Sequence, residues 1–304
     1  MFSYTMAQWL FFFYFYCFFG WCFESTVVSV KAKRLVNRGF MRGPFLPLYG
    51  SGAIMMLVVS MPFSHNLGLT YVAGCIGATV LEYITGIIME ALFKVRYWDY
   101  SVKRFNFRGY ICLTSTLAWG GLTILMTRVV HKPIEQLVLD IPHNVLLPIV
   151  FLLTIYIVAD FTLSFKAAID LREILVKLDA VKEELERVQR RLDIIIALAS
   201  EGREDKKQER GSRLDELISN IEERLSGLRE RVKSGVVVYP ESMREEIIEL
   251  WTKYKVSLEN SRQIKNLMDI YKRGIIRGNP TMASNKFKHT LQEIKEAVND
   301  KLKK

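Results

Sequence analysis

The 304-residue chain lacks the motifs of several enzyme classes. It contains no G-x-x-x-x-G-K-[ST] segment, so it carries no P-loop ATPase of its own, and no G-x-S-x-G or H-E-x-x-H segment. Its four cysteines never form a C-x-x-C pair, which argues against a zinc site or a disulfide framework. We therefore expect no metal and no cofactor, and we interpret the cysteines as buried thiols.

Charged residues are scarce in the first half of the chain. Residues 1–165 hold 12 of the 42 Lys and Arg residues and 7 of the 32 Asp and Glu residues, so residues 166–304 hold the other 30 and 25. An apolar half followed by a charged half predicts a membrane domain followed by a soluble helical region. The first residues lack a basic segment and a small-residue cleavage site, so we expect the first helix to remain in the mature protein.

Five apolar runs approach the ~20 residues that a helix needs to span a bilayer. They cover about 5–28, 45–62, 70–93, 110–130 and 144–165. The connections 31–43 and 94–109 are rich in Lys and Arg, whereas 63–69 has none and 131–143 has only Lys132. This alternation predicts a protein of the cell membrane with its N-terminus outside, both basic connections in the cytoplasm, and the C-terminal half in the cytoplasm.

The C-terminal half is predicted to be helical throughout, and no strand pattern appears anywhere, so the fold class is all-α. Residues 166–199 read as a coiled-coil helix, 200–211 as a charged linker and 212–304 as a further helical region. The heptads within 171–195 predict a homo-oligomer or a partner protein. The lysines near the C-terminus come without a recognition motif, so we expect no nucleic-acid partner. The heptad positions are Leu171, Ile174, Leu178, Val181, Leu185, Val188, Leu192 and Ile195.

A stretch rich in glycine and proline, residues 39–52, precedes and enters the second span. Two interpretations remain open at this point. The stretch is either a helix start followed by a closely packing glycine face, or a broken helix whose free N–H groups face an anion. Its structural positions are Gly39, Gly43, Pro44, Pro47, Gly50 and Gly52.

The third span carries acidic residues on a stripe of small ones. Gly74, Ala78, Glu82, Gly86 and Glu90 recur every four residues, which places them along one helix face. Small residues let a neighbouring helix approach closely, so this face is predicted to contact protein and not lipid. An ionisable residue inside a span costs at least ~2–3 kcal/mol, which makes Glu82 the first candidate for a functional residue.

The predicted topology gathers polar residues on the cytoplasmic side of the bundle. In our hypothesis, Glu82 is the carboxylate that binds substrate or a proton, Arg42 and Asn106 are its polar partners, and Trp98 forms an interfacial wall. For Glu24 and Glu90, pairing with nearby arginines or reaching out to water is an equally good explanation. The full candidate set is Glu24, Arg42, Tyr49, Glu82, Glu90, Trp98, Asp99 and Asn106.

Four segments together resemble a known family. They are Gly20-Trp21-x-x-Glu24, the segment from Gly39-Phe40 to Gly52, Trp98-Asp99-Tyr100-Ser101 with Asn106-x-x-Gly109, and Ser115-x-x-x-Trp119-Gly120. In this order, over about residues 5–130, the chain is similar to the bacterial multi-pass membrane family labelled "putative ABC-transporter type IV". The resemblance implies a permease-like subunit with a separate ATPase subunit. The five predicted spans of this chain are fewer than the roughly six expected in one half of an ABC exporter.

Three functions are consistent with these residues. The first is a transport component whose polar site lies toward the cytoplasmic half of the bundle. The second is a membrane-embedded enzyme that acts on a lipid or a lipid-linked substrate and uses the same carboxylates as acid and base. The third is a non-catalytic scaffold that recruits partners through its heptads. The sequence does not decide between an enzyme and the other two.

Overall fold

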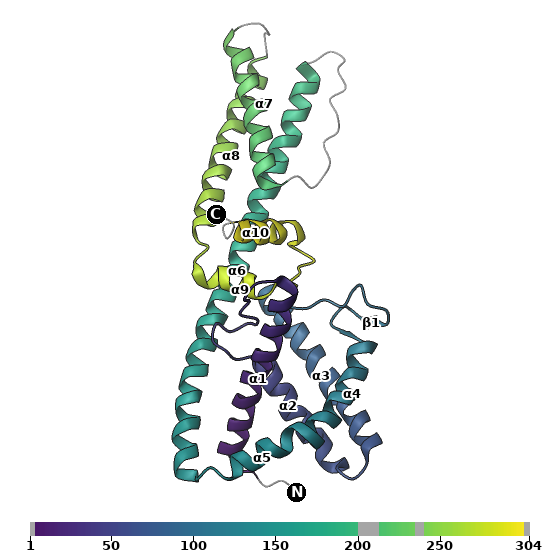
Figure 1. Ribbon diagram of the computed structural model, residues 1–304. Coiled ribbons are helices and arrows are strands. Elements are labelled where there is room, and N and C mark those ends of the chain that lie inside the picture. Colours follow the sequence, from purple (N-terminus) through teal and green to yellow (C-terminus); the bar gives the residue numbers. More distant parts are fainter. Residues whose placement is uncertain (1–3, 200–212, 235–239, 301–304) are drawn as a thin grey trace. The chain divides into compact units, whose positions relative to one another are not determined.

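The computed structural model describes residues 4–199, 213–234 and 240–300 and divides them into two compact units (Figure 1). Unit 1 consists of residues 1–170 and 270–285, and unit 2 of residues 171–269 and 286–304. The expected charged linker, 200–211, lies outside the described residues. The sequence did not predict that a segment near the C-terminus, 270–285, belongs to unit 1.

Unit 1 is built from apolar helices, and four of them are long and apolar enough to cross a membrane: Met6–Ala32, Leu67–Phe93, Leu113–Leu139 and the start of the helix from His143. A shorter apolar helical segment, Pro47–Phe63, corresponds to the predicted second span. The elements are α1 (Met6–Ala32), α2 (Pro47–Ser60), the turn η1 (Met61–Phe63), α3 (Leu67–Phe93), α4 (Leu113–Leu125), the π-helical turn η2 (Met126–Val130), α5 (His131–Leu139) and α6 (His143–Ala199).

The all-α class is confirmed, with one short hairpin that the sequence did not predict. A two-stranded antiparallel sheet, β1 (Asn106–Phe107) with β2 (Ile111–Cys112), forms in the connection between α3 and α4. Strands of two residues are too short to produce an alternating pattern of hydrophobicity. Gly109, with φ +75°, lies in the tight turn between them, where a residue without a Cβ is favoured. The class remains all-α apart from this hairpin.

Glycines set the distance between α1 and α2, which lie side by side (Figure 1). A Cβ at Gly20 would overlap Tyr49, and a Cβ at Gly50 would overlap the Cys17 sulfur and lie 2.7 Å from the Phe13 carbonyl oxygen. Around Gly52, in contrast, nothing lies within 4 Å of an added Cβ. The close packing therefore depends on Gly20 and Gly50 and not on every glycine of the motif.

The glycine- and proline-rich stretch is a loop that leads into a continuous helix. Helix α2 begins at Pro47, so Pro44 lies outside the helix and not at its first position. Two backbone N–H groups of the loop bind α6: that of Gly43 donates to the Asp160 carboxylate at 2.8 Å, and that of Arg42 donates to the Ser164 hydroxyl at 3.3 Å. The loop is thus held by side chains of α6.

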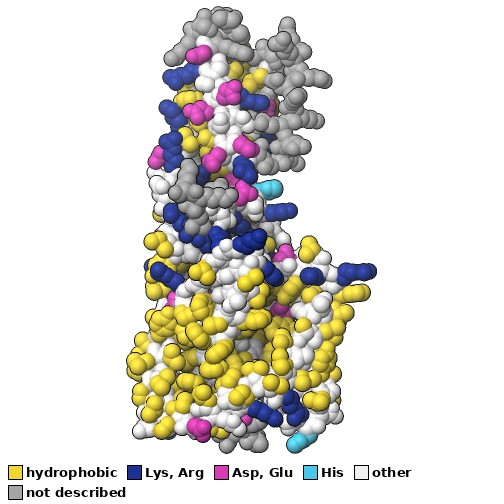
Figure 2. All heavy atoms as spheres, viewed as in Figure 1, with side chains coloured by type: hydrophobic (Ala, Val, Ile, Leu, Met, Phe, Trp, Pro, Cys, Tyr) yellow, Lys and Arg dark blue, Asp and Glu magenta, His cyan; other side chains and the backbone are white. Residues whose placement is uncertain are grey.

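The small-residue stripe of α3 faces protein, as predicted. Gly74, Ala78, Glu82 and Gly86 are buried, and α3 lies beside α4. A Cβ at Gly74 would overlap Thr123 of α4. Other faces of the helices in unit 1 carry exposed hydrophobic side chains, which cover much of its surface in Figure 2. Such a surface is expected of a protein whose helices lie in a lipid bilayer.

Unit 2 packs the heptad stripe of α6 inside the chain itself. It contains the second part of α6, α7 (Leu214–Ser234), α8 (Glu241–Asn266) and α10 (Lys288–Asp300). All eight heptad positions are less than 10 % exposed, and Leu185 and Leu192 are fully buried. Arg191 pairs with Glu246 of α8 at 2.8 Å, and Lys182 pairs with Glu293 of α10 at 2.9 Å. A second chain would have to displace these helices to use the stripe, which the sequence assigned to oligomerisation.

Two features of the helices near the C-terminus come from residues without a hydrophobic signal. The buried stripe of α8 includes Ser257 and Ser261, which allow close helix contact, whereas Trp251 is only half-buried. Helix α9 (Ile270–Gly278) runs through Gly274 and belongs to unit 1. Periodicity alone predicts neither feature.

We expect Gly50→Val to lower the free energy of unfolding by about 1–3 kcal/mol, because the added carbons overlap Cys17 and Phe13. Thermal unfolding of the purified protein in detergent measures the change. Gly52→Ala is the matched control: with open space around its Cβ, it should be neutral or stabilising by ~0.5–1 kcal/mol. Equal destabilisation by both changes would contradict the assignment of close packing to Gly50.

Candidate functional site

The carboxylate of Glu82 lies inside the bundle and is bound by neutral groups. Its residue is 6 % exposed. The Tyr100 hydroxyl donates to Oε1 at 3.0 Å, and the Trp119 indole N–H donates to Oε2 at 3.0 Å. The Ser115 hydroxyl oxygen lies 3.4 Å from Oε2. Within the described chain no Lys, Arg or His pairs with Glu82, so its charge is opposed only by dipoles.

The three partners come from two elements that the local sequence holds in place. Ser115 and Trp119 stand four residues apart on α4 and therefore share a helix face. Ser115 also caps α4, because its oxygen accepts from the Cys112 N–H at 3.3 Å and its hydroxyl donates to the Cys112 carbonyl at 2.9 Å. Tyr100 lies in the α3–α4 connection, where its N–H donates to the Gly109 carbonyl at 2.9 Å.

This arrangement accommodates both protonation states of Glu82. As a carboxylate it accepts from Tyr100 and Trp119. The single Ser115 hydrogen has two acceptors within reach, Glu82 Oε2 at 3.4 Å and the Cys112 carbonyl at 2.9 Å; when it lies on the Cys112 carbonyl, the Ser115 oxygen accepts from a protonated Glu82. Burial, followed by the charge and hydrogen bond of Glu82, raises the pKa of Tyr100, so this hydroxyl keeps its proton and remains a donor.

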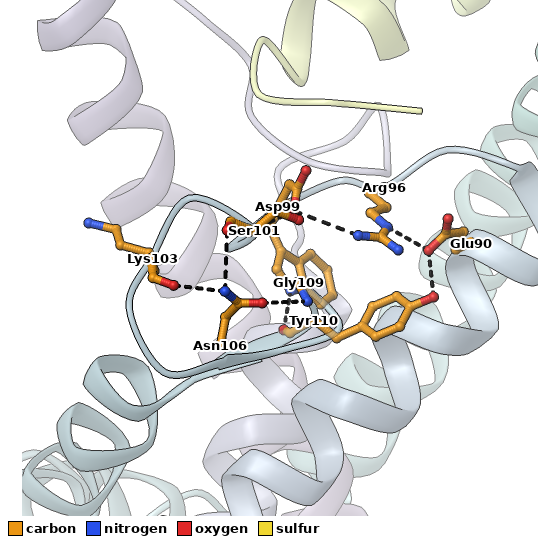
Figure 3. Close-up of polar contacts among 9 residues, drawn as sticks. Glu90, Arg96, Asp99, Ser101, Lys103, Asn106, Gly109 and Tyr110 are labelled. Carbon is orange, nitrogen blue, oxygen red and sulfur yellow. Dashed lines mark hydrogen bonds and ion pairs between the residues drawn. The ribbon is translucent and has the colours of Figure 1, made fainter. Parts of the chain in front are cut away.

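Glu90, one turn from the end of α3, belongs to an ion-pair network in the α3–α4 connection (Figure 3). Arg96 Nε donates to Glu90 Oε2 at 2.6 Å, and the Tyr110 hydroxyl donates to the same oxygen at 2.5 Å. Arg96 also lies 4.6 Å from the Tyr110 ring centre, and its Nη1 is 3.7 Å from Asp99 Oδ1. Arg96 therefore joins Glu90 and Asp99, two of the predicted site residues.

Asp99 and Asn106 shape the same connection. Asp99 Oδ1 accepts from the Ser101 N–H at 2.9 Å and from the Ser101 hydroxyl at 2.5 Å. The Asn106 amide donates to the carbonyls of Ser101 and Lys103 at 3.2 and 2.7 Å, and its oxygen accepts from the Gly109 N–H at 3.1 Å (Figure 3). Asn106 thus binds backbone and not Glu82, the partner that the sequence suggested. It fixes the loop that carries Tyr100.

Trp98 packs on the same face of α3 as the acidic residues. Its indole N–H donates to the Tyr110 carbonyl at 3.0 Å. A Cβ at Gly86 would lie 3.4 Å from the Trp98 ring and 2.9 Å from Tyr110. Gly86 therefore leaves room for these two aromatic residues, which hold the loop against α3 between Glu82 and Glu90.

Glu24 and Tyr49 are also brought together. The Tyr49 hydroxyl donates to Glu24 Oε1 at 2.9 Å, and Arg38 Nε lies 3.7 Å from Glu24 Oε2. The charge of Glu24 acts on the hydroxyl of Tyr100 as well, since it contributes to the raised pKa of Tyr100. Of the glutamates at positions 24, 82 and 90, Glu82 alone has no paired cation among the described residues.

Arg42 contacts a segment that the sequence analysis did not place here. Its guanidinium lies 4.4 Å from the ring centre of Tyr271 in α9, and it makes no ion pair with Glu82 in the described chain. The same C-terminal segment binds both basic connections: Arg38 Nη1 donates to Asn279 Oδ1 at 2.7 Å, and Arg96 and Ala283 exchange backbone hydrogen bonds of 2.7 and 2.8 Å.

Residues 270–285 thus cover the end of unit 1 where the acidic residues gather. Arg38 contacts both Glu24 and Asn279, and Arg96 contacts both Glu90 and Ala283. The amide of Asn279 also donates to the Gly39 carbonyl at 2.8 Å, and Gly39 has φ +129°, a conformation that favours glycine.

Sequence reasoning missed Tyr100, Ser115, Trp119 and Arg38. A signal for three of them was present: Tyr100 lies within the Trp98–Ser101 segment, and the hydrogen-bonding residues Ser115 and Trp119 stand at i and i+4 on α4. Arg38 had no distinguishing feature among the basic residues around it. No group of acidic, histidine or cysteine side chains within the described residues is arranged to hold a metal ion.

Comparison with known proteins identifies the family. The family described as "Putative ABC-transporter type IV" matches residues 11–165, just over half of the chain. The chain belongs to this family. Neither the curated proteins nor the solved structures include a match. The matched region contains most of α1, all of α2 to α5, the start of α6, and the three hydrogen-bond partners of Glu82.

We expect Asn106→Ala to loosen the α3–α4 connection, because three backbone groups lose their partner. The cost should be about 1–3 kcal/mol. Hydrogen exchange of residues 99–110 in the detergent-solubilised protein measures the effect. Lys103→Ala is the control, since its side chain is exposed and Asn106 binds only its backbone carbonyl. Unchanged exchange in Asn106→Ala would show that other contacts fix the loop.

Proposed function

We propose that this membrane protein is a permease-like component of a transport system and that Glu82 is the group that binds its cargo, a cationic solute or a proton. The observation that carries the proposal is the state of Glu82. It is a buried carboxylate in an apolar helix, bound by neutral donors only. A charge in such a place is stabilised when a proton or a cation neutralises it.

The surroundings of Glu82 support binding better than a purely structural role. Glu24 is paired with Arg38 and Glu90 with Arg96, so the charges of these two carboxylates are balanced without a ligand from solution. Both ion pairs lie at the end of unit 1 covered by 270–285, since Arg38 and Arg96 also contact that segment. Within this proposal, Glu24, Tyr49, Glu90, Trp98 and Asp99 shape the access to the site. Arg42 and Asn106 hold the two connections.

The orientation proposed here follows from charge. The connections α1–α2 and α3–α4 carry most of the Lys and Arg residues of the first half, so we place them in the cytoplasm. With Pro47–Phe63 counted as a span, the chain crosses the membrane five times, and its N-terminus lies outside. Because the chain has no P-loop, an ATPase that drives transport would be a separate subunit, and unit 2 offers a cytoplasmic surface for it.

We expect Glu82→Gln to abolish the transport phenotype while leaving the fold intact, because glutamine keeps the shape and removes the charge. The measurement compares small charged solutes inside cells and in the medium by mass spectrometry, with and without the expressed protein. Glu183→Gln, at an exposed position of α6, is the control. A solute distribution that Glu82→Gln leaves unchanged would refute the proposal, and accumulation of one lipid class would favour a membrane enzyme.

A chemical test does not require the cargo to be known. We expect dicyclohexylcarbodiimide, an apolar reagent that modifies protonated carboxylic acids, to label Glu82 in reconstituted vesicles, with more labelling at lower pH. Peptide mass spectrometry locates the modification, and Glu82→Gln should remove it. A water-soluble carbodiimide, which favours the exposed acids of unit 2, is the control. Labelling of Glu24 or Glu90 with Glu82 untouched would contradict the assignment of Glu82 as the exchanging group.

A further inference from the structure

A second polar region lies at the opposite end of the unit 1 helices, where α1 begins, α2 ends and α3 begins. It contains a cavity of about 130 Å³. Hydroxyl groups, a histidine and two cations line it together with apolar side chains of α2. The lining residues are Tyr4, Leu57, Ser60, Met61, Ser64, Thr70, Thr127, Arg128, His131 and Lys132. None of them belongs to the set around Glu82.

One wall of the cavity is fixed by a directional hydrogen-bond chain. The Tyr4 hydroxyl donates to Glu135, so its oxygen accepts from His131 Nε2–H at 3.1 Å. The other ring nitrogen of a neutral His131, Nδ1, then accepts from the Tyr16 hydroxyl at 2.7 Å. His131 is 3 % exposed. The sequence analysis placed this histidine in an outward loop, but it lies in α5, and these bonds hold it rigidly.

The π-helical turn η2 precedes this wall directly. A π turn contains one more residue than an α turn, so it changes which residues of the following helix face the bundle, and such turns occur frequently at functional sites. Here it contains Arg128, and His131 and Lys132 follow it. Arg128 donates to the Ser64 carbonyl, which directs its guanidinium over the cavity. Lys132 is exposed at the rim.

The interior of the cavity offers acceptors. The hydroxyls of Ser60, Thr70 and Thr127 donate to the carbonyls of Leu57, Phe63 and Thr123 at 2.9, 2.9 and 2.8 Å. Their hydrogens are therefore committed, and their oxygen lone pairs remain for a ligand that carries N–H or O–H groups. A ligand complementary to the whole cavity carries an anionic group, which binds the cations at the rim, and an N–H or O–H group, which donates to the hydroxyl oxygens of the interior.

We propose that this cavity binds the headgroup of a phospholipid from the bilayer leaflet at this end of the bundle. The phosphate would lie between Arg128 and Lys132, and the amine of an ethanolamine or the hydroxyls of a glycerol headgroup would enter the cavity. A lipid fits better than a dissolved anion because exposed apolar residues adjoin the lining residues in the chain: Phe63 precedes Ser64, and Val129 follows Arg128. Val129 is 60 % exposed, Leu125 48 % and Phe63 37 %, as expected of residues in contact with acyl chains.

The test measures the thermal unfolding midpoint of the purified full-length protein in detergent, since a bound ligand raises it. The additives are phosphatidylethanolamine, phosphatidylglycerol, phosphatidylcholine and diacylglycerol with the same acyl chains, and inorganic phosphate. We expect the first two lipids to stabilise most, because choline has no N–H or O–H donor. Diacylglycerol should have no effect because it lacks the phosphate. Stabilisation by inorganic phosphate alone would show a site for a free anion and overturn the lipid assignment.

Two sets of variants separate the rim from the interior. The double variant Arg128→Gln and Lys132→Gln should bind phosphatidylglycerol at least about tenfold more weakly, since it loses two charge-assisted contacts. Lys103→Gln with Arg104→Gln, two exposed cations of the α3–α4 connection, is the matched control. Thr70→Val with Thr127→Val keeps the side-chain shape and should remove only the preference for ethanolamine over choline.

For each variant, the unfolding midpoint with lipid is compared with the midpoint of the same variant without lipid. A variant that is less stable than the wild type therefore still tests the proposal. Equal stabilisation of the rim variant and the wild type would refute a phosphate site at Arg128 and Lys132. Equal stabilisation by diacylglycerol would show that only the acyl chains bind. Neither result bears on Glu82, so the proposed transport function stands or falls separately.

Discussion

The packing of α3, α4 and the connection between them depends on one carboxylate, Glu82, that pairs with no Lys, Arg or His of the described chain. A bilayer offers no water to the Glu82 side chain, so the surrounding protein must supply every dipole that stabilises it. Trp119 and Ser115 come from α4, Tyr100 comes from the connection before it, and Asn106 and Gly109 fix that connection. The tight hairpin, the capped start of α4 and the glycine under Trp98 are all needed for these donors to reach one point.

The hydrophobic pattern predicted much of this fold, because long apolar runs and the charges between them leave few arrangements in a membrane. The four long apolar helices, the buried stripe of α3 and the burial of Glu82 follow from residue type and spacing. The residues that bind Glu82 do not follow from this pattern. Topology alone suggested Arg42 and Asn106, but the backbone turns in the connections decide which side chains reach Glu82. Asn106 is committed to three backbone groups, and Arg42 stacks on a tyrosine more than 200 residues away.

The same limit applies to the heptads of α6. Periodicity shows that one face of a helix is buried, but it does not show whether the burying helix belongs to the same chain. In unit 2 the buried face of α6 packs against α7, α8 and α10 of the same chain. At the other end of the bundle, His131 shows a further limit: a histidine between apolar segments looks like a loop residue until the π turn extends the helix to include it.

The position of residues 270–285 has a consequence for the order in which the protein is completed. A chain is synthesised from its N-terminus, so the spans are made before most of unit 2. The segment that binds Arg38, Arg42 and Arg96 follows α7 and α8 in the chain, so it is made after them. During synthesis, both basic connections therefore lack these partners until α7 and α8 have been made. Unit 1 acquires these contacts only after much of unit 2 has left the ribosome, which ties the maturation of the two units together.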